Sequence, residues 1–301
     1  MTNTKKRYAL ALHGGAGAVA GRNYAVTEKH LRQLATDCDR WLAEGRSALD
    51  VVEHAVVEFA VAELESCGLY VAGRGSAPNS AGHVELDASI MDGRSREAGA
   101  VAALCDFVSP VQVARAVMER TPHVMLAGTG ALEFARAQGF DEVPDPANYY
   151  TLPVGVTRDD IQDIAHGTVG AVALDTSGGL AAATSTGGTF GKLHGRIGDT
   201  PLVGPGTWAD DNIAISFTGT GEHIIRAGGA TAIAFRYRSG MALVDAINET
   251  LKEIKRLGGD AGVIALTSKG EIAMPYNSEG MKRASVSNDS SRSTITVATF
   301  G

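Results

Sequence analysis

A single threonine stands where the sequence changes from a polar stretch to a strand-like one. Thr168 lies in the run AHGTVGAVAL (165–174), directly after Gly167, and a turn, DTSGG, and a second apolar run, LAAATSTGG, follow. Taken alone, the pattern predicts a β-hairpin whose first strand contains a β-branched residue. The hydroxyl gains a chemical use if Thr168 becomes an N-terminus. A free α-amine, with a pKa of about 7.7 to 8.0, can then accept the hydroxyl proton near neutral pH without a histidine.

The segment before Thr168 is compatible with such a cleavage. Residues 139–166, GFDEVPDPANYYTLPVGVTRDDIQDIAH, contain three prolines and five aspartates and have weak apolar periodicity. This composition predicts an exposed connector over about 139–167. Gly167 permits a strained backbone while the Thr168 hydroxyl attacks the preceding carbonyl. The sequence therefore indicates self-cleavage between Gly167 and Thr168, although composition alone leaves the plain hairpin open.

Other catalytic patterns fail on spacing. The stretch LALHGGAGAVAG follows a predicted strand but reads GxGxxxG and leads into a polar segment rather than an apolar helix, so it does not predict a dinucleotide site. The stretch TGGTFGKL resembles a phosphate loop, yet Leu193 stands where Ser or Thr should bind magnesium. The sequence contains neither HExxH nor GxSxG, which removes the usual zinc and serine hydrolases.

Composition restricts the remaining possibilities. With 301 residues, of which 44% are hydrophobic, the chain can bury a large core in one or two domains. No apolar run approaches a membrane span, and the N-terminal apolar run is too short for a secretion signal, so we expect a cytoplasmic protein. Three cysteines without a CxxC pair predict neither a disulfide framework nor a zinc knuckle, and a net charge of -7 disfavours nucleic acid. A small-molecule substrate is the better expectation.

The 37 glycines occur in clusters, which predicts tight turns between packed elements. Hydrophobic periodicity and turn residues predict a mixed α+β protein of antiparallel sheets covered by helices. The predicted helices are 27–43, 47–63, one opened by Ser109 and Pro110, 131–137, one from Glu222, and 241–256. The predicted strands are 8–12, 84–91, 98–105, two after Thr168, 213–218, 262–267, 272–274 and 293–300, with a polar, glycine-rich loop over 186–207.

Nine stretches, in order and spacing, resemble the plant-type asparaginase and isoaspartyl peptidase family of N-terminal nucleophile hydrolases. They are LHGGAGA at 12–18, AGRGS at 72–76, VELDASIMDG at 84–93, GAVAAL at 99–104, ARAVMERTPHVMLAGTGALEFA at 114–135, GTVGAVALD at 167–175, STGG at 185–188, GRIGDTPLVGPGTWAD at 195–210 and TGTGE at 218–222.

The resemblance implies a single domain with a four-layer αββα sandwich of two stacked, mainly antiparallel sheets. It also implies autocleavage into an α subunit, 1–167, and a β subunit, 168–301, which assemble as a dimer of αβ units. The implied reaction is hydrolysis of β-aspartyl amides, namely isoaspartyl dipeptides and L-asparagine, through an acyl-threonine intermediate and without an organic cofactor.

The family's catalytic roles match individual positions here. Thr168 would be the nucleophile released from Gly167, and Thr186 would hydrogen-bond near it. Thr218 and Gly219 would form the oxyanion hole, through a hydroxyl and a backbone N–H. An ordinary turn from strand to helix is the alternative interpretation of Thr218 and Gly219.

The same resemblance implies how substrate is held. Arg196 would bind the α-carboxylate and Asp199 the α-amine, a pairing that suits a guanidinium and a carboxylate, and Gly221 would complete the amine pocket. A surface ion pair between Arg196 and Asp199 is the alternative.

Two further features come from the comparison with the family. A sodium ion is held there by backbone carbonyls of a loop, which matches six positions in this chain: Leu64, Glu65, Cys67, Tyr70, Ala72 and Arg74. The chain departs from the family at Val71, where the loop normally carries Asn. An Asn could orient the Thr168 amine or bond to a backbone group, so the valine predicts a slower or selectively tuned enzyme.

Two other functions remain as alternatives. Glycosylasparaginase has a related core, but it carries a TGDG- or TGNG-like loop and a tryptophan near its N-terminus. This chain reads TGTGE, and its tryptophans are Trp41 and Trp208. A small-ligand binding protein that keeps the pocket but does not process itself is the second alternative.

Overall fold

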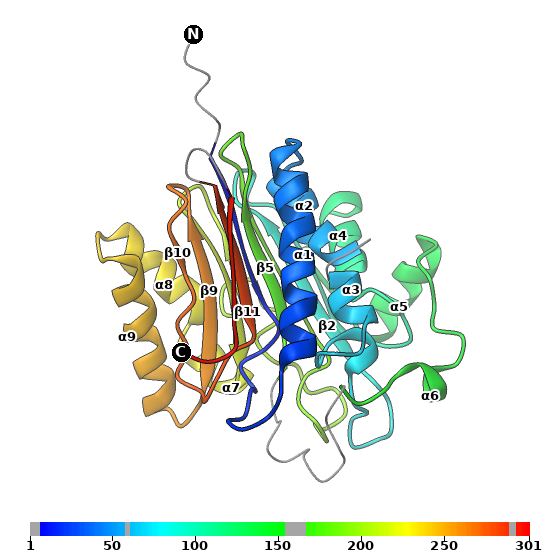
Figure 1. Cartoon of the computed structure of the whole chain (residues 1–301). Helices are drawn as coiled ribbons and strands as arrows, with labels where there is room; N and C mark the ends of the chain where they lie inside the picture. Colours follow the sequence, from blue (N-terminus) through cyan, green and yellow to red (C-terminus); the bar gives the residue numbers. More distant parts are fainter. Residues whose placement is uncertain (1–6, 58–60, 154–166, 289–292) are drawn as a thin grey trace.

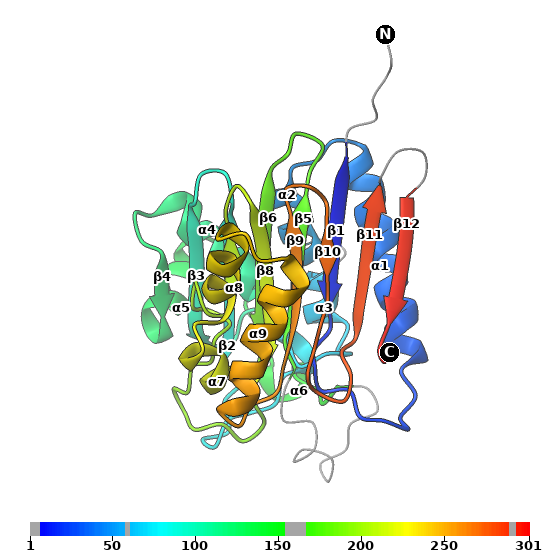
Figure 2. The ribbon, with the colours of Figure 1, turned by 90° about the vertical axis from the view of Figure 1, so that its left-hand side faces the viewer.

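Two β-sheets face each other, and each carries helices on its outer side (Figure 1). The computed structural model describes residues 7–57, 61–153, 167–288 and 293–301, without the side chains of 54–57 and 61–63. The four layers confirm the predicted αββα sandwich. Figure 2 shows α8 and α9 in front of the smaller sheet, with the larger sheet behind them. Among the described helices, none is long and apolar enough to cross a membrane.

The larger sheet has the order β12-β11-β1-β5-β6-β2-β3-β4 within the described residues. Its neighbouring strands are antiparallel, except that β3 and β4 are parallel, because the chain crosses over between them through α4. The strands are β1 (Tyr8–His13), β2 (Leu86–Asp92), β3 (Ala98–Leu104), β4 (Met125–Ala127), β5 (Val169–Leu174), β6 (Leu180–Thr186), β11 (Arg283–Asn288) and β12 (Ser293–Ala298).

The smaller sheet is antiparallel, with the order β10-β9-β8-β7 in the part of the chain that the structure describes. Its strands are β7 (Thr207–Ala209), β8 (Ile213–Gly219), β9 (Ala261–Thr267) and β10 (Ile272–Ala273). Helices α7 (Gly221–Arg226), α8 (Gly229–Arg238) and α9 (Leu243–Arg256) pack on its outer face. In α9, buried apolar residues recur at helical spacing, as in Leu243, Ile247, Leu251 and Ile254.

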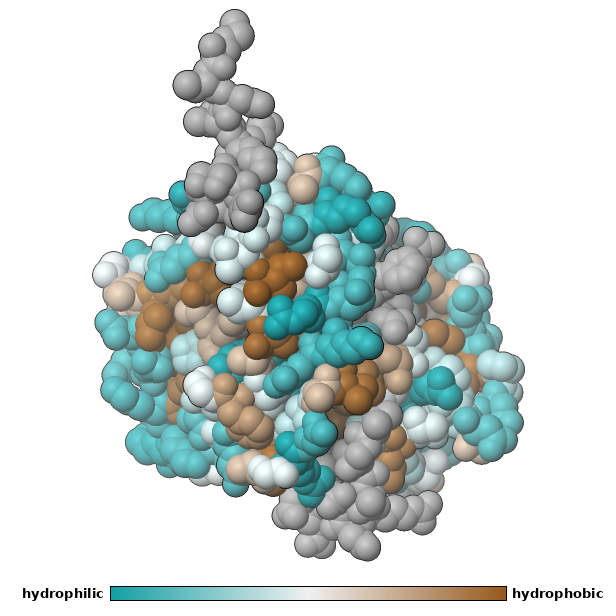
Figure 3. Space-filling view, viewed as in Figure 1, coloured by the Kyte–Doolittle hydropathy of each residue, from teal (hydrophilic) through white to brown (hydrophobic). Residues whose placement is uncertain are grey.

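The outer face of the larger sheet is covered by α1 (Ala25–Ala43), α2 (Ala48–Val57), α3 (Val61–Ser66), α4 (Pro110–Arg120) and α5 (Gly128–Ala137). A short 3-10 turn, Gly73–Gly75, and the one-turn helix α6 (Pro146–Tyr149) lie in loops. Polar side chains cover much of the face seen in Figure 3, with apolar patches between them.

Strand alternation decides what lies between the two sheets. In β1, Tyr8, Leu10 and Leu12 face the helices, whereas Ala9 and Ala11 belong to the apolar cluster between the sheets. The same period of two continues along the other central strands. It directs a set of polar residues into the space between the sheets, near one end of the strands: His13, Thr168, Thr184, Thr186, Ser216 and Thr218.

Most predicted elements are present within a few residues, and the differences have local causes. The helix predicted over 47–63 is α2 followed by α3, with 58–60 outside the described residues. The loop predicted over 186–207 ends in β7, and the helix predicted from Glu222 is followed by α8 after the turn at Gly228. Strands β4 and β11 were not predicted, because β4 is short and β11, RASVSN, is largely polar.

The predicted connector is described only in part. Residues 139–153 are mostly exposed and contain α6, as expected of a surface segment. Residues 154–166 lie outside the described residues. The predicted cleavage after Gly167 therefore stays a prediction.

Candidate active site

Thr168 directly precedes β5 and lies between the sheets, with 6% of its surface exposed. Its hydroxyl donates to Thr186 Oγ1 over 3.3 Å, and the Thr186 hydroxyl donates to the Gly167 carbonyl oxygen over 2.7 Å. The Gly188 N–H donates to Thr186 Oγ1 over 3.0 Å and so fixes that hydroxyl in place. Thr186 therefore donates its proton to the oxygen on which negative charge would develop if Thr168 attacked the preceding peptide.

Gly167 has no room for a side chain. A Cβ atom there would overlap with the side chain of Val71, which is buried. On the other side, a Cβ on Gly15 would lie 3.2 Å from the Gly167 Cα and 3.4 Å from the Thr168 nitrogen. Glycines and one valine thus hold the predicted scissile peptide closely on both sides.

A histidine that the sequence analysis did not single out also touches the nucleophile. His13, at the end of β1, is fully buried, and its Nδ1 atom lies 3.0 Å from the Thr168 carbonyl oxygen. Its Nε2 atom lies 2.9 Å from Ser216 Oγ in β8. Burial lowers the pKa of His13 to about 3, so the ring is neutral at physiological pH. The alternation of side chains along β1 could have indicated this position, because residues 9, 11 and 13 share the face that lies between the two sheets.

The loop between β6 and β7 carries Asp199, which is only 4% exposed. Within the described residues, its Oδ2 atom is buried without a hydrogen-bond partner. Burial raises the pKa of Asp199 to about 7, because the charged form loses its water. A buried carboxylate oxygen without a partner is a site for a cationic group, and an α-ammonium fits this description.

Arg196 lies beside Asp199 and is held by a residue outside the predicted set. Its Nε and Nη2 atoms both donate to the Glu222 carboxylate over 2.8 Å. In the described chain, the ion pair of Arg196 is thus with Glu222 and not with Asp199. A Cβ on Gly198 would lie 2.8 Å from Arg196 Nη1, and one on Gly221 would lie 3.0 Å from Nη2. These glycines keep side chains away from the second edge of the guanidinium, where a carboxylate can bind.

Thr218 and Gly219 end β8 behind the nucleophile. Thr218 is fully buried, and its Oγ1 atom accepts the Ala16 N–H over 3.1 Å, so its own proton is still available to a ligand. Gly219 has φ +139°, and a Cβ there would collide with the Asp260 carbonyl oxygen. The chain does turn from strand to helix here, and the turn places Gly219 in the wall of the cleft beside Thr168.

Five of the seven predicted catalytic and substrate-binding residues line one small cleft together, namely Thr168, Thr186, Arg196, Asp199 and Gly219. Thr218 precedes Gly219 in β8, and Gly221 lies behind the two charged groups, near enough that a Cβ there would be 2.9 Å from Asp199 Oδ1. The remaining wall consists of Gly167, Gly188, Thr189, Gly198 and Thr200.

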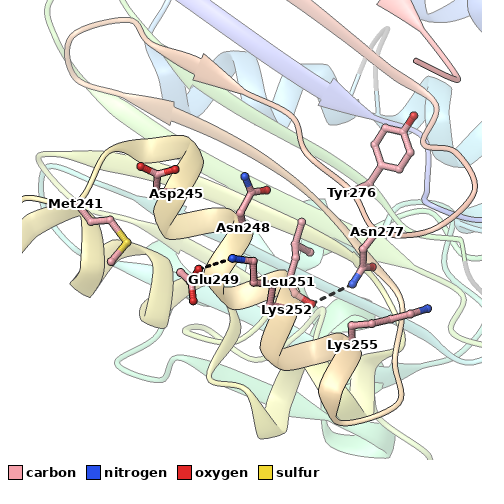
Figure 4. A pocket seen from close by; sticks show the side chains of 9 residues that line it. All are labelled: Met241, Asp245, Asn248, Glu249, Leu251, Lys252, Lys255, Tyr276 and Asn277. Carbon is pink, nitrogen blue, oxygen red and sulfur yellow. Dashed lines mark hydrogen bonds and ion pairs between the residues drawn. The ribbon is translucent and has the colours of Figure 1, made fainter.

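Larger clefts lie elsewhere among the described residues, and two of them are wide. One is bounded by the loops 76–84, 144–152 and 190–191. The other lies between α9 and the segment of Tyr276 and Asn277, and Figure 4 shows its side chains. There Lys252 pairs with Glu249, and the Asn277 amide donates to the Leu251 carbonyl oxygen over 3.0 Å. This second cleft shares no lining residue with the cleft of Thr168.

The six residues of the predicted sodium loop lie at the end of α3 and in the segment that leads to the Gly73–Gly75 turn. A Cβ on Gly73 would lie 2.5 Å from the Glu65 carbonyl oxygen, and one on Gly75 would overlap with the Tyr70 carbonyl oxygen. The two glycines therefore leave carbonyls free of side chains, which fits an oxygen-only site for a hard cation. Elsewhere in the described residues, no group of three acidic, histidine or cysteine side chains could hold a metal.

The Glu65 side chain joins this loop to β6. It is fully buried and accepts hydrogen bonds from Ser109 and Ser185, the residue before Thr186. Burial raises the pKa of Glu65 to about 8. The loop is thus hydrogen-bonded to the strand that ends at the active site.

Comparison with known proteins finds relatives that match most of the length of this chain. The family model described as asparaginase matches residues 6–296. An isoaspartyl peptidase of Salmonella typhimurium is 44% identical over 301 residues, covering 91% of this chain and 94% of that protein. One from Escherichia coli is 41% identical, covering 91% of each chain. A probable isoaspartyl peptidase/L-asparaginase 2 of Arabidopsis thaliana is 38% identical, covering 94% of this chain and 96% of that protein. With the matching fold and the threonine, arginine and aspartate in one cleft, the chain belongs to the asparaginase family.

Proposed function

We propose that the chain cuts itself between Gly167 and Thr168 and then hydrolyses β-aspartyl amides, both isoaspartyl dipeptides and L-asparagine. The observation that carries the substrate class is the unpartnered Oδ2 of buried Asp199 beside Arg196, in the cleft of Thr168. An α-ammonium would satisfy the first group and an α-carboxylate the second. The names of the relatives, isoaspartyl peptidase and L-asparaginase, support the same class.

Self-cleavage would use the hydrogen bonds already present. The Thr168 oxygen attacks the Gly167 carbonyl carbon, while Thr186 donates to the oxygen that becomes negative. The hydroxyl proton passes to the nitrogen of Thr168 as the C–N bond breaks, which leaves a free α-amine and an ester between Gly167 and the threonine side chain. Water then hydrolyses the ester, releasing the Gly167 carboxylate and the Thr168 hydroxyl.

Hydrolysis of substrate would repeat the chemistry with the new amine as base. The amine takes the hydroxyl proton as Oγ1 attacks the side-chain amide carbon, and the Thr218 hydroxyl and Gly219 N–H stabilise the oxyanion. The leaving amine takes that proton as its C–N bond breaks. Water then hydrolyses the aspartyl ester and regenerates the threonine.

Incubation of the purified chain followed by a denaturing gel tests the first step. Cleavage after Gly167 divides the 301 residues into fragments of 167 and 134 residues, and N-terminal sequencing of the smaller one should begin at Thr168. The Thr168→Ala variant should stay a single band and hydrolyse nothing. A fragment that began at another residue, or cleavage of the variant, would contradict the mechanism.

A substrate series tests the second step and the alternatives. An isoaspartyl dipeptide and L-asparagine should release aspartate, whereas substrates with a blocked α-amine should not react, because Asp199 needs the ammonium. Preference for an N4-glycosylated asparagine would instead indicate a glycosylasparaginase. An intact band together with ligand binding would indicate the silent binding protein.

The proposal includes a structural sodium ion held by the carbonyls of the 64–74 loop. Its role would be to hold that loop against β6, with no part in the chemistry. Replacing sodium with choline in the buffer should lower the melting temperature, and restoring sodium should reverse the change. An unchanged melting temperature would argue against the site.

A dimer of αβ units and a cytoplasmic location complete the proposal. Exposed apolar side chains on α8, on α9 and between them, Phe235, Val244 and Met241, could contribute to a subunit contact. Among the described residues, Cys38, Cys67 and Cys105 form no disulfide, which supports the proposal of a reducing compartment. Sedimentation of the processed protein should give twice the 31.2 kDa of one chain, and cell fractionation tests the compartment.

A further inference from the structure

Five polar side chains form a row across the space between the two sheets. They come from five different strands, and each is at most 1% exposed: His13, Ser89, Thr184, Thr207 and Ser216. Their neighbours in this layer form a cluster of small and aliphatic side chains. Burying polar groups there is costly unless each one is hydrogen-bonded, so their arrangement needs a reason.

The five side chains form one continuous series of contacts between hydrogen-bonding groups, each 2.9 Å or shorter, which we call the hydroxyl line. His13 Nε2 lies 2.9 Å from Ser216 Oγ, which lies 2.7 Å from Thr184 Oγ1. Thr207 Oγ1 lies 2.5 Å from Thr184 Oγ1, and Ser89 Oγ lies 2.8 Å from Thr207 Oγ1. The line alternates between the two sheets and crosses the space between them four times.

Both ends of the hydroxyl line are backbone carbonyls of the candidate active site. At one end, His13 Nδ1 lies 3.0 Å from the carbonyl oxygen of Thr168. At the other, Ser89 Oγ donates to the carbonyl oxygen of Thr200 over 2.6 Å. Thr200 follows Asp199 and lines the same cleft as Thr168. The line therefore joins the nucleophile to the loop that carries the ammonium site.

Gly170 shows that the chain makes room for this line. It lies in the interior of β5, where glycine weakens a strand. A Cβ atom on Gly170 would overlap with both Ser216 Oγ and His13 Nε2. The glycine thus lets the imidazole and the hydroxyl meet across the two sheets.

We propose that His13 is a positioning residue, which fixes the Thr168 carbonyl, and that the hydroxyl line holds the nucleophile at a set distance from the Asp199 loop. A carbonyl oxygen only accepts, so the ring proton must be on Nδ1, and Nε2 accepts from Ser216. Of the residues in the line, only His13 then matters for self-cleavage, whereas hydrolysis of a bound substrate depends on the whole line. This inference rests on the proposed function, since it concerns the same nucleophile and loop.

Two substitutions of His13 separate positioning from packing. In His13→Asn the amide nitrogen takes the place of Nδ1 and can still donate to Thr168, whereas in His13→Gln it takes the place of Nε2. Self-cleavage, measured on a gel, should be at least about tenfold faster in the Asn variant than in the Gln variant. Equal rates in the two variants would overturn the role of His13. This comparison needs no substrate, so it can be made even if the chain does not hydrolyse β-aspartyl amides.

Severing the hydroxyl line in its middle tests the second half of the proposal. Thr207→Val removes one hydroxyl at nearly constant volume, far along the line from Thr168. It should lower kcat on an isoaspartyl dipeptide about 3- to 10-fold, with self-cleavage and KM within about twofold of the parent. The double variant Ser216→Ala/Thr207→Val should lose less than the product of the single losses, because both break one line.

A matched control is available at another hydroxyl pair. Ser285 Oγ lies 2.6 Å from Thr296 Oγ1 between β11 and β12, outside the hydroxyl line. Ser285→Ala removes a hydrogen bond of the same kind and should leave kcat unchanged. If Ser285→Ala lowers kcat as much as Thr207→Val, or if the two line substitutions act independently, the line serves stability alone. If the parent chain cleaves itself but hydrolyses no β-aspartyl amide, the proposed function fails and the line's role in hydrolysis fails with it, while the His13 comparison still stands on its own.

Discussion

The two halves of the cleft differ in how their polar groups are paired. Around the nucleophile, Thr168, Thr186 and the Gly167 carbonyl form a connected set of hydrogen bonds. In the substrate half, Asp199 Oδ2 has no partner within the described residues, and Arg196 pairs with Glu222, which is 54% exposed. The difference agrees with the proposed order of events: the hydrogen bonds that self-cleavage would use are made in the uncut chain, whereas the substrate half keeps a buried carboxylate oxygen for an ammonium group.

The largest effect should come from the nucleophile half. Thr186→Val removes the donor to the Gly167 carbonyl at nearly constant volume, so self-cleavage should slow by about 100-fold or more, as for loss of an oxyanion donor. A time course on a denaturing gel measures this. Thr189→Val, in the wall of the same cleft, should cleave at the parental rate. If both variants cleave alike, the Thr186 hydroxyl does not act on the scissile carbonyl.

The next largest effect is expected on substrate binding, and only in the substrate half of the cleft. Asp199→Asn should raise KM about 10- to 100-fold, the contribution of a hydrogen bond to a charged group, and leave self-cleavage unchanged. Equal loss of both activities would mean that Asp199 supports the fold instead.

The pH dependence of KM sharpens the same prediction. Burial raises the pKa of Asp199 to about 7, so the carboxyl gains a proton as the pH falls through 7 and no longer attracts an ammonium. KM should therefore rise toward about tenfold per unit below pH 7 in the parent and stay flat in Asp199→Asn. A parental KM that is flat between pH 5 and 7 would contradict this assignment.

A smaller effect is expected from Glu222, which orients Arg196 from the solvent side. Because the carboxylate is exposed, its loss should raise KM only about 2- to 5-fold in Glu222→Ala, with kcat unchanged. Glu279→Ala, which removes another exposed carboxylate, is the control. A fall in KM would show that Glu222 competes with substrate for the guanidinium.

The smallest effect is expected at Val71, against Gly167. Restoring the family's amide with Val71→Asn should raise kcat or the maturation rate by a factor of several, since one added hydrogen bond is worth about 0.5–1.5 kcal/mol. Val71→Thr keeps the shape without an amide and serves as the comparison. Rates that are unchanged or lower in the Asn variant would mean that the valine belongs to a repacked loop.

The sequence predicted the layers of the fold and the residues that line the cleft. It predicted less well which residues hold those side chains in place. The resemblance to the asparaginase family placed Thr168, Thr186, Arg196 and Asp199 in one site, and the structure brings them into one cleft, although Arg196 and Asp199 lie within the long loop between β6 and β7. Glu222 and His13 were not singled out, since their roles come from contacts with residues 26 and 155 positions away. Strand β11 was missed for a related reason: its polar sequence is a strand only because β1 and β12 pair with it.

The hydroxyl line has one contact more than it has protons. Six contacts join the Thr168 and Thr200 carbonyls, and the neutral ring and four hydroxyls supply five protons. When the ring proton of His13 is donated to the Thr168 carbonyl oxygen, one contact further along the line is left as two oxygen atoms with no hydrogen between them. Valine at Thr207 would remove one proton and two contacts and leave every remaining contact with its proton. The middle of the line is therefore the place where a substitution can separate the line's connection from its contribution to stability.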